Sequence, residues 1–181
     1  MSFTFKPLFI PGVILISPQS FPDDRGDFFE SFKASDFQKA GLSTRFVQDN
    51  FSFSKKGVIR GLHYQKSPKA QGKLISVIKG CVWDVAVDIR QDSKTFLKWM
   101  AVELDDRNHV MLYIPPGFAH GFLALSDEVL LIYKCTNEYD PQVDTGIRWD
   151  DPDIAISWPI KSPILSVKDR QLPYVRNVAT I

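Results

Sequence analysis

Arg60, His63 and Lys73 lie within fourteen positions of the segment "RGLHYQKSPKAQGKL", residues 60–74. An imidazole acts as a base near neutral pH, and a lysine ammonium can stabilise an oxyanion. A third group, Tyr133 of "VLLIYKCT", can donate a proton. Each residue type alone also fits a structural role, a phosphate clamp or a metal site. Only the combination favours acid/base chemistry.

The segment "VIRGLHYQ" has the pattern of a β-strand, which decides where its polar side chains point. Alternation along a strand places Ile59, Gly61, His63 and Gln65 on one face. Arg60 then points to the other face, unless Gly61 introduces a bulge. The sequence leaves both orientations of Arg60 open.

Lys73 and Tyr133 also fall on strand faces that carry apolar companions. Lys73 shares a face with Ile75 and Val77 in "KLISVI", and Tyr133 shares one with Leu131 in "VLLIYKCT". A polar side chain on such a face needs a partner or a function, because burial without a hydrogen bond is costly. An inward lysine is the most unusual of the three.

Short β-rich runs separated by turn residues dominate the chain, which predicts an all-β sandwich or barrel. One helix is expected near "SDFQKAG", with Ser35 as its N-cap and Gly41 just past its end. The proline-rich segment "WDDPDIAISWPIKSPILSVKDRQLP" should wrap the β core in irregular turns and a short helix. No linker or repeat divides the chain, so we expect one domain over residues 1–181.

Charge and hydropathy argue against a nucleic-acid or membrane partner. The formal net charge is +1, and no basic run or apolar segment of about 20 residues occurs. Lys6 and two prolines interrupt the apolar N-terminus, which makes it a poor signal peptide. Cys81 and Cys135 lie in apolar stretches and are expected to be buried thiols. A cytoplasmic protein is the expectation.

The segment "IPPGFAHGF", which contains His120, resembles the second motif of the cupin superfamily, a small β-barrel fold that often carries a metal. Aligned with the first cupin motif, this chain places His63, Gln65 and Lys73 where metal ligands are usual. A lysine ammonium has no lone pair for a metal and repels one. We therefore expect an organic acid/base site and no metal.

Seven segments in order resemble the dTDP-4-dehydrorhamnose 3,5-epimerase family, from about Pro11 to about Asp169. They are "DDRGDFFESF", "FVQDNFSFSKKGVIRGLHYQ", "AQGKL", "WDVAVDIR", "IPPGFAHGF", "YKCTNEYDP" and "LSVKD". The resemblance implies a cupin-type jelly roll with a few short helices. It also implies inversion of the two carbons that flank the C4 ketone of a dTDP-4-dehydro-6-deoxy sugar, without any cofactor. Family members are homodimers whose partner chain can contribute to the nucleotide pocket.

The same resemblance assigns the catalytic groups. His63 would be the base, oriented by Asp169, since a carboxylate behind an imidazole favours the imidazolium that forms. Lys73 would face the C4 oxygen as it becomes an enolate oxygen. Tyr133 would return a proton from the opposite face. A base on one side of the sugar and an acid on the other suffice for epimerisation.

The resemblance also implies a set of binding residues. Arg25 and Arg60 would contact the diphosphate, and Glu30, Gln48 and Asn50 would contact the nucleotide. Tyr139 would stack on the thymine ring, and Lys73 and His120 would contact the sugar. Asp144 and Lys168 would lie at the margin of the site. Without the family, Arg25 would be a solvated turn residue and Asp169 a surface charge. The sequence does not decide the roles of Asp84 and Asp88: one could brace His120, or both could be solvated or salt-bridged.

The chain departs from the family pattern at three positions: Phe51 replaces a common histidine, Asp144 a common glutamate and Asp27 a common apolar residue. None removes a catalytic group. The alternatives are an epimerase acting on C3 or C5 alone, a ketoisomerase on the same barrel, a non-enzymatic binding module and a metal-dependent cupin oxygenase. Lys73 argues against the last of these.

Overall fold

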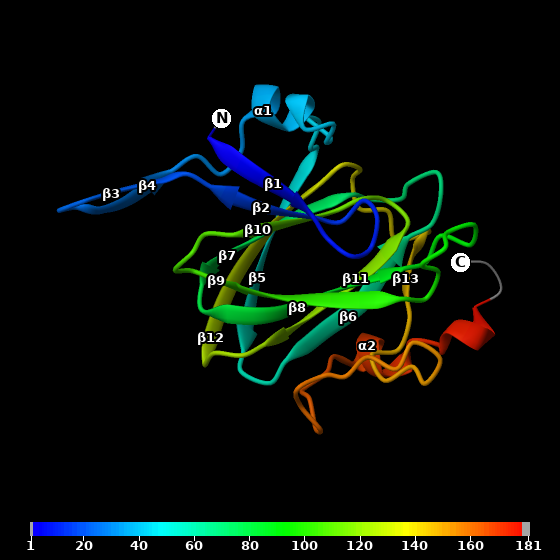
Figure 1. Ribbon diagram of the computed structural model, residues 1–181. Helices are drawn as coiled ribbons and strands as arrows, with labels where there is room; N and C mark the ends of the chain where they lie inside the picture. The colour runs from blue at the N-terminus through cyan, green and yellow to red at the C-terminus, as the bar shows by residue number, and fades with distance from the viewer. Residues whose placement is uncertain (1, 179–181) are drawn as a thin grey trace.

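The computed structural model describes residues 2–178 as a β-sandwich with short helices (Figure 1). Its strands are β1 (Phe3–Pro7), β2 (Ile14–Pro18), β3 (Ser20–Asp23), β4 (Gly26–Phe29), β5 (Gln48–Lys55), β6 (Ile59–Gln65), β7 (Lys73–Lys79), β8 (Cys81–Asp88), β9 (Trp99–Asp105), β10 (Met111–Ile114), β11 (Phe118–Ala124), β12 (Glu128–Cys135) and β13 (Asp144–Gly146). The helices are α1 (Ala34–Lys39), α2 (Val167–Gln171) and the 3₁₀ turn Val175–Asn177.

Two antiparallel sheets form the sandwich. One has the order β1-β2-β10-β7-β12-β5 and the other the order β13-β6-β11-β8-β9. Strands distant in sequence are neighbours in both sheets, as in a jelly roll. The predicted all-β, cupin-type fold is confirmed. A third, small sheet contains only β3 and β4, and this hairpin projects from the body of the molecule (Figure 1).

The main hydrophobic core lies between the two large sheets. Ile75, Leu112 and Leu131 from the six-stranded sheet pack with Val82 and Phe122 from the five-stranded sheet. Each side chain is at most 3% exposed. Burial of this size, at roughly 25 cal/mol per Å² of apolar surface, is the main force that holds the sheets face to face. Polar side chains on these inner faces are therefore buried by the fold itself.

Chain segments cover part of the outer face of each sheet. Helix α1 places Phe37 against Phe3 and Tyr113 on the six-stranded sheet. The C-terminal segment covers the five-stranded sheet, where Ile154 and Val175 pack with Leu62. This agrees with the predicted irregular C-terminal wrap and its short helix, which is α2.

Some local predictions were wrong. Helix α1 begins two residues earlier than predicted, so Ser35 lies inside it, and Lys33 occupies the N-cap without a side-chain hydrogen bond. Gly41 does lie just past the helix, at a φ of 73°. The predicted strand "FFESF" contributes only Phe28 and Phe29 to β4. Strands β1, β3 and β13 were not anticipated.

The orientation of Arg60, which the sequence left open, is decided by a bulge in β6. Pairing with β11 joins His63 to His120 but Arg60 to Phe122, so the register shifts between them. Gly61 has a φ of 120°, and a Cβ there would lie 2.6 Å from the Cα of Gly121. Only glycine fits this close approach. The extra residue turns Arg60 to the same face as His63.

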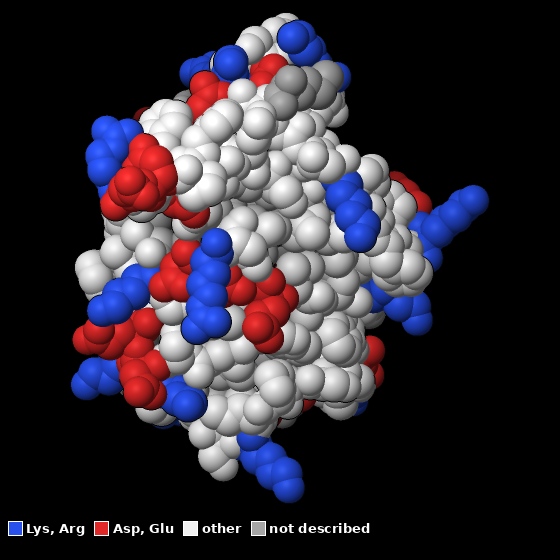
Figure 2. Space-filling view, turned by 60° about the vertical axis from the view of Figure 1, so that its left-hand side comes forward, with Lys and Arg blue, Asp and Glu red and all other residues white. Residues whose placement is uncertain are grey.

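On the face shown in Figure 2, acidic and basic side chains lie next to one another, mainly at the left and along the edges, and a broad area between them is uncharged. This agrees with the net charge of +1. Within residues 2–178, no helix is both long enough and apolar enough to cross a membrane.

Candidate active site

A cavity of about 290 Å³ opens between the two sheets and brings together the acid/base residues. The five-stranded sheet contributes His63 and His120, and the six-stranded sheet contributes Lys73 and Tyr133 from the opposite wall. The remaining lining residues are Phe51, Ser52, Phe53, Arg60 and Phe122. Four of the polar residues predicted from separate segments therefore face one space.

His63 forms a dyad with Asp169. Its Nε2 lies 2.6 Å from Oδ1 of Asp169, whose side chain is only 4% exposed. Burial by itself raises the pKa of Asp169, but the interactions with His63, together with hydrogen bonds to Ser166 and the backbone of Gly61, outweigh burial and leave that pKa below its usual value. Since Asp169 accepts the Nε2 proton, the lone pair for a substrate proton lies on Nδ1.

Helix α2 holds Asp169 in place. Ser166 caps the helix, and its hydroxyl accepts a hydrogen bond from the backbone N–H of Asp169 at 3.0 Å. Asp169 thus lies in the first turn, where a carboxylate is favoured by the helix dipole. The sequence segment "SVKD" supplies both the cap and the dyad carboxylate.

A second histidine–carboxylate pair lies beside the first. Nε2 of His120 lies 2.9 Å from Oδ2 of Asp84, and the Asp84 side chain is entirely buried. Strand pairing places His120 opposite His63, so the two imidazoles come from neighbouring strands of one sheet. This geometry decides the question left open by the sequence: Asp84 braces His120, and Asp88 does not.

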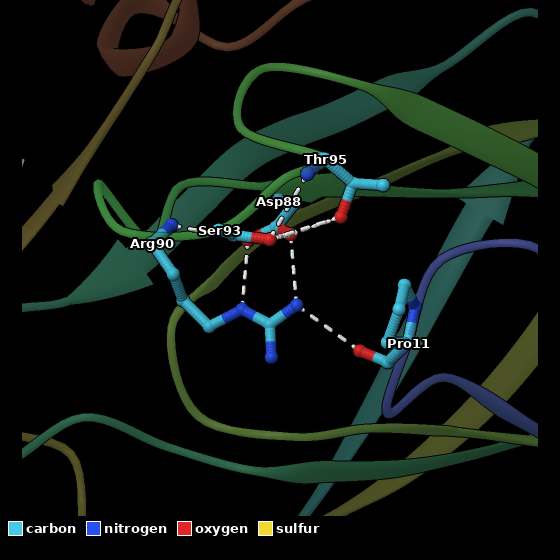
Figure 3. Close-up of polar contacts among 5 residues, drawn as sticks. All are labelled: Pro11, Asp88, Arg90, Ser93 and Thr95. Carbon is cyan, nitrogen blue, oxygen red and sulfur yellow. Dashed lines mark hydrogen bonds and ion pairs between the residues drawn. The ribbon is translucent and has the colours of Figure 1, made fainter.

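Asp88 instead holds together a structural cluster (Figure 3). Its carboxylate accepts hydrogen bonds from Nε and Nη2 of Arg90 and from the hydroxyls of Ser93 and Thr95. Arg90 also donates to the backbone carbonyl of Pro11. The cluster ties the end of β8 to the loop between β1 and β2 and lies outside the cavity lining.

Lys73 enters the cavity from β7. Burial lowers the pKa of its ammonium, while the negative charges of Asp84 and Asp144 act in the opposite direction. Its Nζ lies 5.7 Å from the ring centroid of Tyr133. An anion that develops near Lys73 would stabilise the ammonium, which burial otherwise disfavours.

Tyr133 stands on β12 next to Lys73. Burial raises the pKa of its phenol, and the Asp144 charge adds to this effect, whereas the Arg60 charge opposes it. The hydroxyl therefore stays protonated at neutral pH and can act as a proton donor. Arg60 itself is held at the rim by hydrogen bonds to the Ser54 hydroxyl and the Phe53 carbonyl.

Five other predicted binding residues lie outside the cavity lining and are joined to one another by a chain of polar contacts. Gln48 bonds the side chain of Asn50 and the backbone N–H of Tyr139. The Tyr139 hydroxyl donates to Asp144, which also pairs with Lys168, the residue before Asp169. Five of the predicted binding residues thus form one connected border beside the dyad.

Two of the predicted binding residues lie apart from the cavity within their own chain. Arg25 is at the end of the projecting β3–β4 hairpin, with its side chain 90% exposed and bonded to Asp23. Glu30 follows the hairpin and pairs only loosely with Lys33, at 3.6 Å. Neither residue lines the cavity that holds His63.

Gln65, at a position where a cupin metal ligand is usual, has a structural role. Its amide donates to the carbonyls of Lys69 and Glu138 and accepts from the N–H of Asp140. In the part of the chain that the structure describes, no three His, Cys, Asp or Glu side chains are grouped so that they could hold a metal ion. The donor set around Lys73 does not fit a cupin metal.

The sequence analysis did not predict that Phe122 lines the cavity, and it did not decide the role of Asp84. Phe122 follows His120 by two positions, so strand alternation already placed both on one face. The register between β8 and β11 pairs His120 with Ala86 and leaves Asp84 and Asp88 each two residues away, so the choice needed the direction of the His120 side chain, whose Nε2 lies 2.9 Å from Oδ2 of Asp84. No local pattern gives that direction.

The fold and the site together define a class: a cupin-type jelly roll whose interior carries acid/base side chains. A family model described as dTDP-4-dehydrorhamnose 3,5-epimerase matches residues 7–177. The chain belongs to the dTDP-4-dehydrorhamnose 3,5-epimerase family.

Individual relatives agree with this family. A protein from Methanothermobacter thermautotrophicus named dTDP-4-dehydrorhamnose 3,5-epimerase is 52% identical over 93% of this chain and 92% of its own. A crystal structure of dTDP-6-deoxy-D-glucose-3,5-epimerase from Legionella pneumophila, in complex with dTDP-4-keto-L-rhamnose, is 45% identical. It has a TM-score of 0.93 over 97% of this chain and 94% of that one. A Streptomyces niveus protein named dTDP-4-dehydrorhamnose 3-epimerase is 39% identical, over 91% of this chain and 80% of its own.

Proposed function

We propose that the protein inverts C3 and C5 of dTDP-4-dehydro-6-deoxy-D-glucose to give dTDP-4-dehydro-L-rhamnose. The observation that carries this proposal is the arrangement of His63 and Tyr133 on opposite walls of one cavity, with Lys73 beside the tyrosine. A proton can then leave one face of the sugar and return to the other. That is the geometric requirement for inversion.

The first step is proton abstraction. Nδ1 of His63 takes the proton from the carbon next to the ketone, and the electrons of the C–H bond pass to the C4 oxygen as an enolate. Asp169 stabilises the imidazolium that results. Lys73 faces the enolate oxygen, where an ammonium in a water-poor site is most effective.

The second step restores the ketone with inverted configuration. The Tyr133 hydroxyl gives its proton to the carbon from the opposite face, and the enolate collapses to the ketone. The step leaves a tyrosinate, which the nearby positive charges of Lys73 and Arg60 stabilise. Exchange with solvent then removes the proton from His63 and returns one to Tyr133, and the cycle repeats at the second carbon.

We assign the polar border and Arg60 to substrate binding. The exposed edge of the Arg60 guanidinium at the cavity rim suits the diphosphate. Gln48 and Asn50 would bond the nucleotide, and the half-exposed ring of Tyr139 would stack on thymine. His120, braced by Asp84, would contact the sugar.

We also propose a homodimer in which the hairpin serves the partner chain. Three observations support it. The hairpin projects from its own body and carries Arg25 away from its own cavity. On the edge strand β5, Phe51 and Phe53 are 63% and 74% exposed, and Phe28 on the hairpin is 67% exposed. Exposed aromatic side chains in this number mark an interaction surface.

The proposed location is the cytoplasm. Both cysteines are free thiols, and burial and neighbouring carboxylates raise the pKa of Cys81 to about 11, which makes it unreactive. Free, inert thiols suit a reducing compartment. The proposed substrate is a soluble sugar nucleotide.

Solvent exchange measured by NMR tests the reaction. The protein is incubated with dTDP-4-dehydro-6-deoxy-D-glucose in heavy water, and the C3 and C5 protons are followed. Deuterium at both carbons is the expected result. A second candidate, a C3-specific epimerase, is favoured only by the Streptomyces niveus relative, and it predicts deuterium at C3 alone. No incorporation at either carbon would overturn the proposed function.

A further inference from the structure

The β3–β4 hairpin, residues 20–29, touches the body of its own chain at one well-defined point. Its strands pair only with each other, and an isolated two-stranded hairpin is marginally stable in water. Across residues 2–178, one polar side-chain contact joins the hairpin to the rest of the chain: Nε2 of His109 lies 3.2 Å from Oδ2 of Asp27.

The same imidazole makes a second contact with the hairpin. The rings of His109 and Phe29 stack with centroids 4.0 Å apart and planes inclined by 17°. Asp27 and Phe29 are two positions apart on β4, so both point to the same side of the strand. The His109 side chain is only 17% exposed as a result. It fixes one side of the hairpin by a hydrogen bond to Asp27 and by a stacked ring.

The turn that carries His109 is itself rigid. The Asp105 carboxylate accepts from the backbone N–H groups of Arg107 and Asn108, and the Asn108 side chain accepts from the N–H of Val110. His109 has a φ of 55°, an uncommon conformation for a residue with a side chain. Such strain persists only where the surrounding structure imposes it. The turn therefore presents the imidazole to the hairpin in a fixed direction.

We propose that His109 is a positioning residue for substrate binding in the partner subunit. Through Asp27 and Phe29 it sets the direction of the hairpin, and with it Arg25 and Glu30, which flank these two contacts in sequence. This inference rests on the proposed function and dimer. His109 itself lies outside the cavity that holds His63, so it acts on binding and leaves the chemical step alone.

Steady-state kinetics of H109A test this inference. We expect KM for dTDP-4-dehydro-6-deoxy-D-glucose to rise roughly 5- to 20-fold, as for the combined loss of a hydrogen bond and an aromatic stack. The value of kcat should stay within about twofold, because bound substrate meets an intact cavity. D27A, on the exposed hairpin, should raise KM in the same direction and to a smaller extent. R107A, in the same turn but exposed, is the matched control and should leave KM unchanged.

Amide hydrogen exchange supplies a readout that does not need turnover. Amides of residues 26–29 should exchange faster in H109A than in the parent protein or in R107A. An unchanged KM in H109A and D27A, in an active parent enzyme, overturns the inference. A kcat that falls as much as kcat/KM also overturns it, since that pattern marks a damaged cavity. If the parent protein is inactive but its H109A variant shows faster exchange, the contact of His109 with the hairpin is supported and the proposed function is rejected instead.

Discussion

At the residue scale, the Asp169 carboxylate controls what His63 can do. The hydrogen bond at 2.6 Å fixes the tautomer, and the lowered pKa of Asp169 keeps its carboxylate charged at neutral pH. D169N should lower kcat by roughly 10²- to 10⁴-fold with a small change in KM. The pKa of Asp169 is lowered in the folded protein. The pair with His63 therefore contributes to the stability of the fold at neutral pH, and this contribution is lost as the pH falls and Asp169 becomes protonated.

A kinetic assay across pH 5–9 checks this prediction. The parent protein and D169N should show the same circular dichroism spectrum, because asparagine keeps the shape of the side chain. A D169N variant with more than a tenth of the parental kcat would contradict the dyad.

Tyr133 offers a test of the two-faced mechanism. Y133F keeps the ring above Lys73 but lacks the proton donor, so His63 can still abstract a proton and return it to the same face. In heavy water, we expect Y133F to exchange the α-proton for deuterium while product inversion falls roughly 10²-fold or more. NMR follows both events in one sample. Equal losses of exchange and inversion would show that Tyr133 acts earlier than we propose.

The sequence analysis succeeded for residues whose strand faces can be derived from alternation. His63, Lys73 and Tyr133 each stood on a predicted face with apolar companions, and all three line one cavity. Asp169 lay beyond that reasoning, because its local surroundings "KDR" are those of a surface charge. Its burial comes from the docking of α2 on β6, a tertiary contact that no local pattern records. Only family resemblance singled it out.

At the scale of elements, the bulge in β6 brings Arg60 and His63 to one face. G61A should disrupt it, because the added Cβ would lie 2.6 Å from the Cα of Gly121 and the φ of 120° strains any other residue. We expect a loss of at least about 3 kcal/mol in the free energy of unfolding. Gly26 has a similar φ of 126° but nothing within 4 Å of its Cβ position.

G26A is therefore the matched control, with an expected loss of about 1 kcal/mol from backbone strain alone. Urea unfolding measures both variants. Equal losses would show that the approach of β11 imposes no constraint on β6.

The cluster around Asp88, which ties β8 to the β1–β2 loop, makes a pH-dependent contribution to the stability of the fold (Figure 3). Burial alone raises the pKa of Asp88, but the hydrogen bonds from Arg90, Ser93 and Thr95 outweigh burial and lower it to about 2. Because the folded pKa lies below the ordinary 3.8, the stability from this cluster is complete above that pH and is lost as the pH falls through about 2.

D88N should lower the free energy of unfolding by about 1–2 kcal/mol at pH 7, after allowance for solvent screening. The deficit should shrink as the pH is lowered toward 3, which is the sign expected for a depressed carboxyl pKa. Urea unfolding at several pH values checks this, with D92N at an exposed neighbouring position as the control. A deficit that is constant with pH would mean that shape, and not charge, accounts for the effect.

Prediction at this scale was best for the long strands and worst for the short ones. Strands β5 to β12 carry clear apolar periodicity and lie close to their predicted positions. Strands β3 and β4 bury almost nothing, so they leave no periodic signal, and their pairing appears only in three dimensions. The N-cap of α1 was misplaced because Ser35 has a capping side chain but lies one residue inside the helix.

At the scale of the whole molecule, the separation of Arg25 from its own cavity leads to a complementation experiment. H63A has no base in its own cavity but keeps an intact hairpin, whereas R25A keeps the cavity and damages the hairpin. If hairpins serve the partner subunit, a mixed dimer has one complete site, formed by the R25A cavity and the H63A hairpin. Mixtures of the two variants, after subunit exchange, should therefore be more active than either variant alone.

The expected gain has a definite ceiling. Random exchange of equal amounts makes half of the dimers mixed, and each mixed dimer carries one complete site of two. The activity per chain of the mixture should thus approach about a quarter of the parental value, in addition to the residual rate of R25A. The assay uses substrate concentrations well below the raised KM of R25A. H63A mixed with H63A/R25A is the control and should stay inactive. A mixture whose rate is only the average of its two components would place Arg25 outside the partner's site, and the hairpin would then need another explanation for its exposed aromatic side chains.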